Sequence, residues 1–171
     1  MPEIADYLKH IDILIADPDE RIRSLVRDVL VNSGFTNVIQ TNNGKEAITR
    51  LREQNIDLLI TDWRMAPVNG MQLIDYLRAD KSSPNPYLPI IMLTGRAERK
   101  DVSAARDIGV TEFLVKPFTA KALYERLVMV IENPRSFIIS NDYHGPDRRR
   151  RTDIPPTGID RRKNPPINGG G

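Results

Sequence analysis

The chain has 171 residues, of which 40% are hydrophobic and 28% charged, enough for one globular domain with an appendage. Its apolar runs are far shorter than the ~20 residues of a membrane-spanning helix, and it has no cysteine, which excludes disulfides and thiolate metal sites. The sequence opens on no basic and apolar leader, so we expect a cytoplasmic protein that does not insert into a membrane.

The net charge of +2 hides an uneven distribution of charge. Residues 1–133 have 17 Lys and Arg against 19 Asp and Glu, whereas residues 134–171 have 8 against 4. The second segment also holds 6 of the 13 prolines and 5 of the 10 glycines. Because such a composition buries too little apolar surface to fold alone, we predict a globular domain over 1–133 and a basic tail over 134–171 that is disordered when free.

Five short apolar segments alternate with five amphipathic segments along residues 1–133. The apolar segments are rich in Ile, Leu and Val, as strands covered on both faces are. They are residues 11–16, 37–40, 58–61, 90–93 and 112–115. Between them apolar side chains recur at helical spacing, and Gly34 and Gly109 stand where two of the helices should end. Five such units in series predict an α/β protein with a doubly wound, parallel, five-stranded sheet.

Polar residues follow four of the predicted strands: Asp17, Asp62, Thr94 and Lys116. Binding sites in such sheets lie beyond the carboxyl ends of the strands, so two carboxylates, a hydroxyl and an ammonium should meet at one edge. This combination predicts a site for an oxyanion together with a hard cation. Each residue also has a plain structural explanation. Asp17, for example, could be the N-cap of a helix that begins at Pro18.

The spaced residues resemble the CheY-like receiver domains of bacterial response regulators over roughly residues 10–132. Asp62 resembles the phosphoacceptor, and Thr94 resembles the switch hydroxyl. Phe113 resembles the switch aromatic, and Lys116 resembles the lysine that pairs with the phosphoryl charge. The resemblance implies strand order 2-1-3-4-5, a signalling domain rather than an enzyme, and phosphotransfer to Asp62 from a histidine kinase.

The metal ligands depart from the pattern of this family at one position. Receivers have two adjacent acidic residues after the first strand, but here Pro18 stands at the second position and offers no ligand atom. The resemblance then leaves Asp17, Asp62 and the backbone carbonyl of Arg64 as ligands. We therefore expect Mg²⁺ to bind only weakly.

The basic tail contains a repeated unit of five residues. Residues 145–149 read Gly-Pro-Asp-Arg-Arg, and residues 158–162 read Gly-Ile-Asp-Arg-Arg. The planar fork of arginine matches phosphate oxygens and the O6/N7 edge of guanine, and an aspartate can accept from the N1–H and amine of guanine. Guanidinium planes and a tyrosine can also stack on purines. Cyclic di-GMP, with two guanines and two phosphates, would engage all of these groups.

The tail also resembles the arginine-rich extension of single-domain CheY-like regulators that bind cyclic di-GMP. The residues expected to bind the nucleotide are Tyr143, Asp147, Arg148, Arg149, Arg150, Arg151, Asp160, Arg161 and Arg162. The resemblance implies that cyclic di-GMP, as one molecule or a stacked dimer, orders the tail. It further implies recruitment to the flagellar motor switch protein at the cell pole, which would modulate motility.

Two other functions stay open from the sequence. The chain could be a conventional phospho-receiver, switched at Asp62, whose basic tail contacts an acidic partner or an anionic membrane surface. The tail could instead bind nucleic acid through phosphates. Four acids lie among the basic residues of the tail and weaken a purely electrostatic attachment. Because the tail also has no recognition helix, we do not expect DNA binding.

One apolar cluster interrupts the tail at residues 137–139. It could pair as an added strand with a sheet edge, or rest on the surface of the globular domain. The sequence does not choose between these placements.

Overall fold

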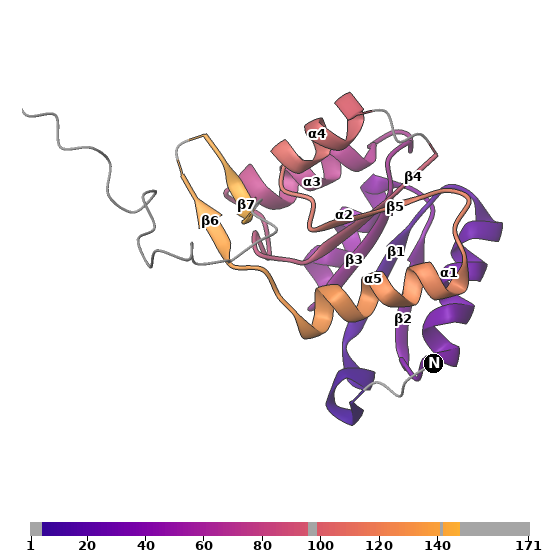
Figure 1. Cartoon of the computed structure of the whole chain (residues 1–171). Coiled ribbons are helices and arrows are strands. Elements are labelled where there is room, and N and C mark those ends of the chain that lie inside the picture. The colour runs from indigo at the N-terminus through magenta and orange to yellow at the C-terminus, as the bar shows by residue number, and fades with distance from the viewer. Residues whose placement is uncertain (1–4, 96–98, 141, 148–171) are drawn as a thin grey trace, which may run out of the picture.

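A computed structural model of the chain describes residues 5–95, 99–140 and 142–147, with backbone alone at 99–101. A parallel sheet with the order β2-β1-β3-β4-β5 forms its centre (Figure 1). The strands are β1 (Asp12–Ala16), β2 (Asn37–Thr41), β3 (Leu58–Asp62), β4 (Ile90–Thr94) and β5 (Glu112–Val115). The predicted doubly wound α/β sheet is confirmed, and each observed strand bound lies within one residue of the expected one.

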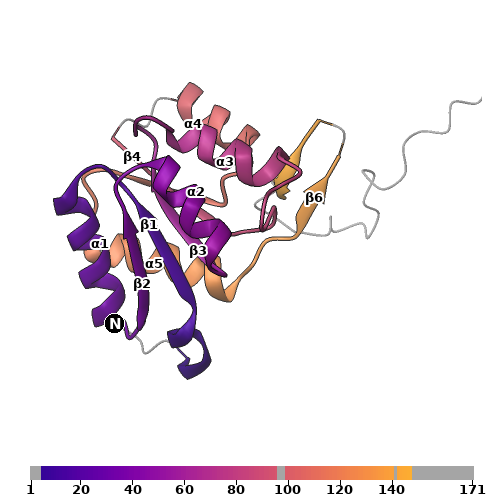
Figure 2. The same cartoon turned by 180° about the vertical axis from the view of Figure 1, so that it is seen from behind.

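Helices cover both faces of this sheet (Figure 2). They are α1 (Glu20–Asn32), α2 (Gly44–Glu53), α3 (Gly70–Ala79), α4 (Arg99–Asp107) and α5 (Ala120–Glu132), and a short 3₁₀ helix, η1 (Asp6–His10), precedes β1. Helices α1 and α5 pack on one face, and α2, α3 and α4 contribute to the core on the other. With both faces covered, β3 and β4 are buried at every residue, which explains their continuous apolar sequences. None of the described helices is both long and apolar enough to cross a membrane.

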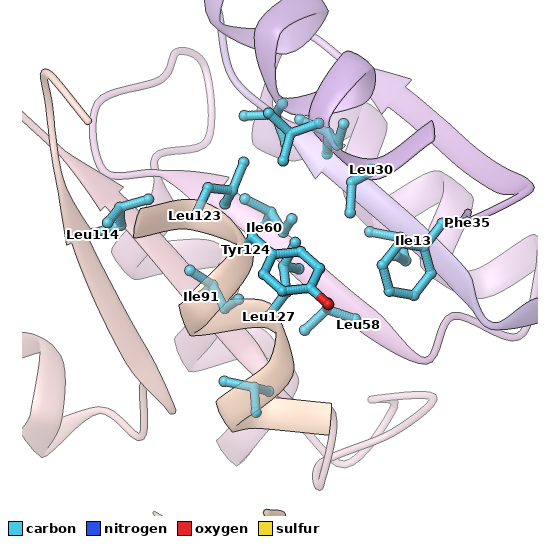
Figure 3. Close-up of a cluster of buried hydrophobic side chains, with 14 of the residues drawn as sticks. Ile13, Leu30, Phe35, Leu58, Ile60, Ile91, Leu114, Leu123, Tyr124 and Leu127 are labelled. Atoms are coloured by element: carbon cyan, nitrogen blue, oxygen red, sulfur yellow. The ribbon is translucent and has the colours of Figure 1, made fainter. Parts of the chain in front are cut away.

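The core on the α1–α5 side consists of interlocking aliphatic side chains (Figure 3). Ile13, Ile60 and Ile91 come from neighbouring strands, and Ile13 and Ile60 are fully shielded from solvent. Leu30 of α1 and Leu123 of α5 meet them from the helices. Burying one such side chain contributes roughly 1.5–3 kcal/mol, so this layer holds the strands, and therefore their carboxyl ends, in place.

Helix α1 begins at Glu20, two residues later than the Pro18 start that an Asp17 cap would require. The side chain of Asp19 is the N-cap and accepts a hydrogen bond from the N–H of Arg21. Asp17 Oδ1 in turn accepts from the N–H of Asp19, at 2.8 Å. The capping interpretation of Asp17 is therefore wrong. Asp19 caps the helix instead. The Asp17 carboxylate is therefore free of the capping role and can contribute to a site at the carboxyl ends of the strands.

The chain after α5 folds into a two-stranded antiparallel hairpin, made of β6 (Phe137–Ile139) and β7 (His144–Pro146). The hairpin is a sheet of its own and lies beside α3 (Figure 1). The apolar cluster thus rests on the globular domain and does not extend the central sheet. The expectation of a disordered tail is wrong for β6 and β7, because the domain surface supplies the apolar contacts that their own composition lacks.

Candidate functional site

The predicted polar residues lie together at the carboxyl ends of four neighbouring strands. Asp17 follows β1, Asp62 ends β3, Thr94 ends β4 and Lys116 follows β5. The loops that hold them are joined by backbone hydrogen bonds, among them one of 2.7 Å from the N–H of Lys116 to the carbonyl of Thr94. The strand order places these ends side by side. The prediction that Asp17, Asp62 and Lys116 converge is thereby borne out.

Lys116 bridges the two carboxylates. Its Nζ donates to Asp17 Oδ2 at 2.6 Å and to Asp62 Oδ1 at 3.0 Å. Asp17 is fully buried and Asp62 is only 7% exposed, so water cannot compensate their charges well. One ammonium therefore balances two buried carboxylates. The pocket keeps a residual negative charge that favours a further cation.

Burial and hydrogen bonding shift the ionisation of this group of residues. Burial disfavours the ammonium of Lys116, but the hydrogen bonds to Asp17 and Asp62 outweigh it and raise the pKa of Lys116 above its ordinary value. At Asp17 burial is the largest effect, and it raises the pKa although Lys116 and the N–H of Asp19 donate to the carboxylate. The lysine thus stays charged, and Asp17 depends on it.

The remaining carboxylate oxygens are held by the backbone. Asp62 Oδ2 accepts from the N–H of Arg64 at 2.9 Å, as Asp17 Oδ1 accepts from Asp19. Arg23 of α1 donates from Nη1 to the carbonyls of Asp17 and Pro18, at 2.7 and 3.2 Å. Arg23 therefore fixes the loop that carries the first carboxylate. This role of Arg23 is not visible in the sequence, because its partners are main-chain atoms.

The loop after Asp62 borders a cavity of about 440 Å³. Its lining residues are Pro18, Trp63, Arg64, Met65, Ala66 and Asn69. Helix α3 starts at Gly70, and a Cβ there would overlap with the carbonyl oxygen of Asp62. Only glycine allows the helix to come this close. The cavity therefore lies next to Asp62, on the side of the loop that follows β3.

The donor set at the pocket fits a hard cation in part. Mg²⁺ is commonly held by one or two carboxylates together with water and phosphate oxygens, and Asp17 and Asp62 supply two. Pro18 lines the adjoining cavity without a ligand atom, and Asp19 is occupied as the cap of α1. Within the described ranges 5–95, 99–140 and 142–147, no three acidic or histidine residues cluster as a complete metal site. Two carboxylates could hold Mg²⁺ here, with water completing its shell.

The two residues predicted to act as a switch, Thr94 and Phe113, lie at the end of β4 and within β5. Thr94 is buried beside the pocket, and Phe113 of β5 is half-buried against the core on the α2–α3 side. Phe113 pairs in register with Met92, two residues before Thr94 in β4. Thr94 and Phe113 therefore sit on adjacent strands near the pocket, and their switching role stays a prediction.

Tyr143 and Asp147, the two predicted tail residues in the described part of the chain, lie away from this pocket. Tyr143 donates from its hydroxyl to the carbonyl of Pro146 at 2.8 Å, and Asp147 donates from its N–H to the carbonyl of Ser136 at 2.7 Å. Tyr143 lies between β6 and β7, and Asp147 directly follows β7. The hairpin contacts the turns that lead into β4 and β5. Asp62 lies at the other end of the sheet, where the strands have their carboxyl ends. The other residues predicted to bind nucleotide lie outside the described residues: Arg148, Arg149, Arg150, Arg151, Asp160, Arg161 and Arg162.

Known proteins are similar to this chain in sequence and in fold. Residues 13–128 match the family model of the response regulator receiver domain. The chemotaxis protein CheY of Pseudomonas aeruginosa is 36% identical over 120 residues, which are 70% of this chain and 95% of that protein. The chemotaxis protein CheY-3 of Vibrio cholerae is 35% identical over 124 residues, 72% of this chain and 94% of that protein.

Solved structures agree with this match. The Vibrio cholerae chemotaxis protein CheY4 superposes with a TM-score of 0.65 at 26% identity, over 71% of this chain and 98% of that one. A putative response regulator from Chloroflexus aurantiacus gives a TM-score of 0.66, also at 26% identity, over 72% of this chain and 98% of that one. The sheet order, the pocket and these similarities lead to one conclusion: the chain belongs to the response regulator receiver family and has a CheY-like receiver domain.

Proposed function

We propose that this protein is a cyclic di-GMP-responsive, CheY-like regulator that binds the second messenger through its arginine-rich tail. The observation that carries the proposal is the repeated Gly-x-Asp-Arg-Arg unit at residues 145–149 and 158–162, following a receiver domain. Each unit brings paired guanidinium forks for phosphate or guanine and one carboxylate for the guanine N1–H and amine. Two units match the two chemically equal halves of cyclic di-GMP.

The output of the regulator follows from its relatives. The proteins to which it is similar are named as chemotaxis proteins. We therefore propose that the flagellar motor switch protein is the partner and that nucleotide binding alters motility. The protein would act as a signalling domain in the cytoplasm and would be recruited to the motor at the cell pole. The nucleotide, bound as a single molecule or as a stacked dimer, would order the tail.

A conventional phospho-receiver is the second candidate, and the Asp17–Lys116–Asp62 arrangement favours it. In this case Asp62 would attack the phosphorus of a histidine kinase's phosphohistidine, forming an acyl phosphate as the imidazole leaves. Lys116 would then pair with the phosphoryl oxygens, and Thr94 would donate its hydroxyl to one of them. Bound Mg²⁺ would offset the repulsion between the carboxylate and the incoming anion. In this case the tail would contact an acidic partner or nucleic acid.

Calorimetric titration of the full chain with cyclic di-GMP tests the first proposal. We expect micromolar or tighter binding, no comparable binding of GMP, and a loss of at least about tenfold in Arg148→Ala and Arg161→Ala, because each removes a charge-assisted contact. Asp62→Asn should bind as the wild type does. Arg27→Ala, which removes an exposed arginine of α1, is the matched control and should also bind normally.

Two results would contradict this proposal. Absence of cyclic di-GMP binding at physiological salt would contradict the first proposal and favour a conventional phospho-receiver. Equal losses in Arg148→Ala, Arg161→Ala and Asp62→Asn would show that the nucleotide does not bind through the tail alone.

Pro18→Asp is expected to increase the affinity for Mg²⁺ by about tenfold or more, because added ligand charge strengthens binding of hard cations. Trp63 lines the cavity next to Asp62, so quenching of its fluorescence reports the titration. Asp19→Asn is the matched control, since asparagine still caps α1 while one nearby charge is removed. Equal Mg²⁺ affinity in the wild type and Pro18→Asp would show that Pro18 does not limit the site.

A further inference from the structure

The hairpin meets the receiver at a contact that has room only for glycine. A Cβ on Gly145 of β7 would lie 2.7 Å from the Cα of Gly109 and would overlap with the hydroxyl of Tyr143. A Cβ on Gly109 would lie 2.7 Å from the carbonyl oxygen of His144. Backbone therefore packs on backbone at this point. Gly145 is also the first residue of the first arginine unit.

A buried arginine lies under the same contact. Arg78 of α3 donates to the carbonyl of Gly109 from Nε and Nη2, at 3.1 and 3.0 Å. Its guanidinium carbon lies 5.3 Å from the ring centre of Phe137, and Tyr87 packs edge-on against that ring at 4.8 Å. His144 Nδ1 lies 3.3 Å from the carbonyl of Arg78. Arg78 thus holds the turn before β5 and both strands of the hairpin.

A buried carboxylate fixes the segment that leads into the hairpin. Glu112 of β5 is 4% exposed and pairs with Arg126 of α5 at 3.7 Å and with Arg135, which follows α5. The N–H of Asp147 then bonds to the carbonyl of Ser136 just beyond Arg135. The chain is therefore held at both ends of the hairpin. The fixed part extends as far as Asp147, the acidic residue of the first unit.

We propose that the docked hairpin fixes the start of the first arginine unit, residues 145–147, on the receiver, and that Gly145 is a positioning residue for nucleotide binding and not a ligand. The inference rests on the proposed binding of cyclic di-GMP. Ordering a backbone residue costs about 1–2 kcal/mol, and a site held in place before binding avoids part of that cost. We therefore expect the two units to differ, because the docking contact requires glycine at Gly145; Gly158 lies outside the described residues.

Gly145→Ala tests this difference, with Gly158→Ala as the matched control. The φ of Gly145 is not positive, so alanine is allowed by the backbone and its effect arises from the contact with Gly109 and Tyr143. We expect Gly145→Ala to bind cyclic di-GMP about tenfold more weakly, and Gly158→Ala to stay within about twofold of the wild type. Phe137→Ala, which removes the ring over Arg78, should weaken binding in the same way.

Hydrogen exchange of the full-length proteins without nucleotide supplies the second readout. The amides of Ile138 and Asp147 should lose protection in Gly145→Ala and Phe137→Ala, while the amides of β1 and β3 stay protected. Wild-type affinity in variants with a released hairpin would overturn the positioning role alone. Equal weakening by Gly145→Ala and Gly158→Ala would also overturn it. Absence of cyclic di-GMP binding in the wild type would instead overturn the proposed function, and the positioning role with it.

Discussion

Replacing Arg78 with methionine is expected to lower the free energy of unfolding by about 4 kcal/mol, since each buried carbonyl left without a donor costs roughly 1–3 kcal/mol. Three carbonyls depend on this side chain. Besides Gly109, Arg78 donates to Pro86 from Nη1 at 2.8 Å and to Leu88 from Nη2 at 2.7 Å. Methionine keeps much of the volume and supplies no donor, so the loss isolates the hydrogen bonds.

The fork of the guanidinium, as well as its charge, is needed at this position. Burial lowers the pKa of Arg78 to about 10, a value that still leaves the guanidinium protonated at neutral pH. A lysine has a single donor atom and cannot reach three separate carbonyls at once. Arg78→Lys is therefore expected to recover less than half of the loss.

Urea unfolding of the full chain measures these effects. Arg27→Met is the control, because Arg27 is exposed and its contact with Asp28 is a long 3.6 Å; it should change stability by less than about 0.5 kcal/mol. We also expect Arg78→Met to lose amide protection in β6 and β7. A stability change below about 1 kcal/mol in Arg78→Met would contradict the assigned hydrogen bonds.

The central fold could be predicted because its signal is local. Segments such as residues 58–60 and 90–93 are apolar throughout, as short strands covered on both faces are. Once the strands are placed, the doubly wound topology brings their carboxyl ends together. Asp17, Asp62 and Lys116 therefore follow from the sequence, although the latter two lie 54 residues apart.

The hairpin could not be predicted because its stability is not local. Its strands have three residues each, in a segment with too few apolar side chains to form a core. It is held by Gly109 and Arg78, which are far away in the sequence and carry no pattern that points to residue 145. Arg78 and Arg23 were missed for a related reason: both donate to backbone carbonyls, and a pattern of side chains does not reveal such partners.

Replacing Lys116 with methionine is expected to destabilise the protein by about 3 kcal/mol at neutral pH without divalent cations, because it leaves two buried carboxylates uncompensated. The pKa of Asp17 is already raised by burial, and the loss of the ammonium raises it further. An acid whose folded pKa exceeds its unfolded value binds protons more tightly in the folded state. The variant should therefore regain stability as the pH falls through the folded pKa of Asp17, and lose it again as the pH rises.

Thermal unfolding with and without Mg²⁺ checks this prediction. Because a cation that binds only the folded state stabilises it by mass action, Mg²⁺ should raise the melting temperature of Lys116→Met more than that of the wild type. Asp17→Asn in the Lys116→Met background should restore part of the stability and abolish the Mg²⁺ effect, since one buried charge and one ligand are gone together. Lys121→Met, at an exposed lysine of α5, is the matched control. If Lys116→Met were as stable as the wild type at neutral pH without Mg²⁺, the two carboxylates would not depend on the lysine, and the charge balance assigned to the pocket would be wrong.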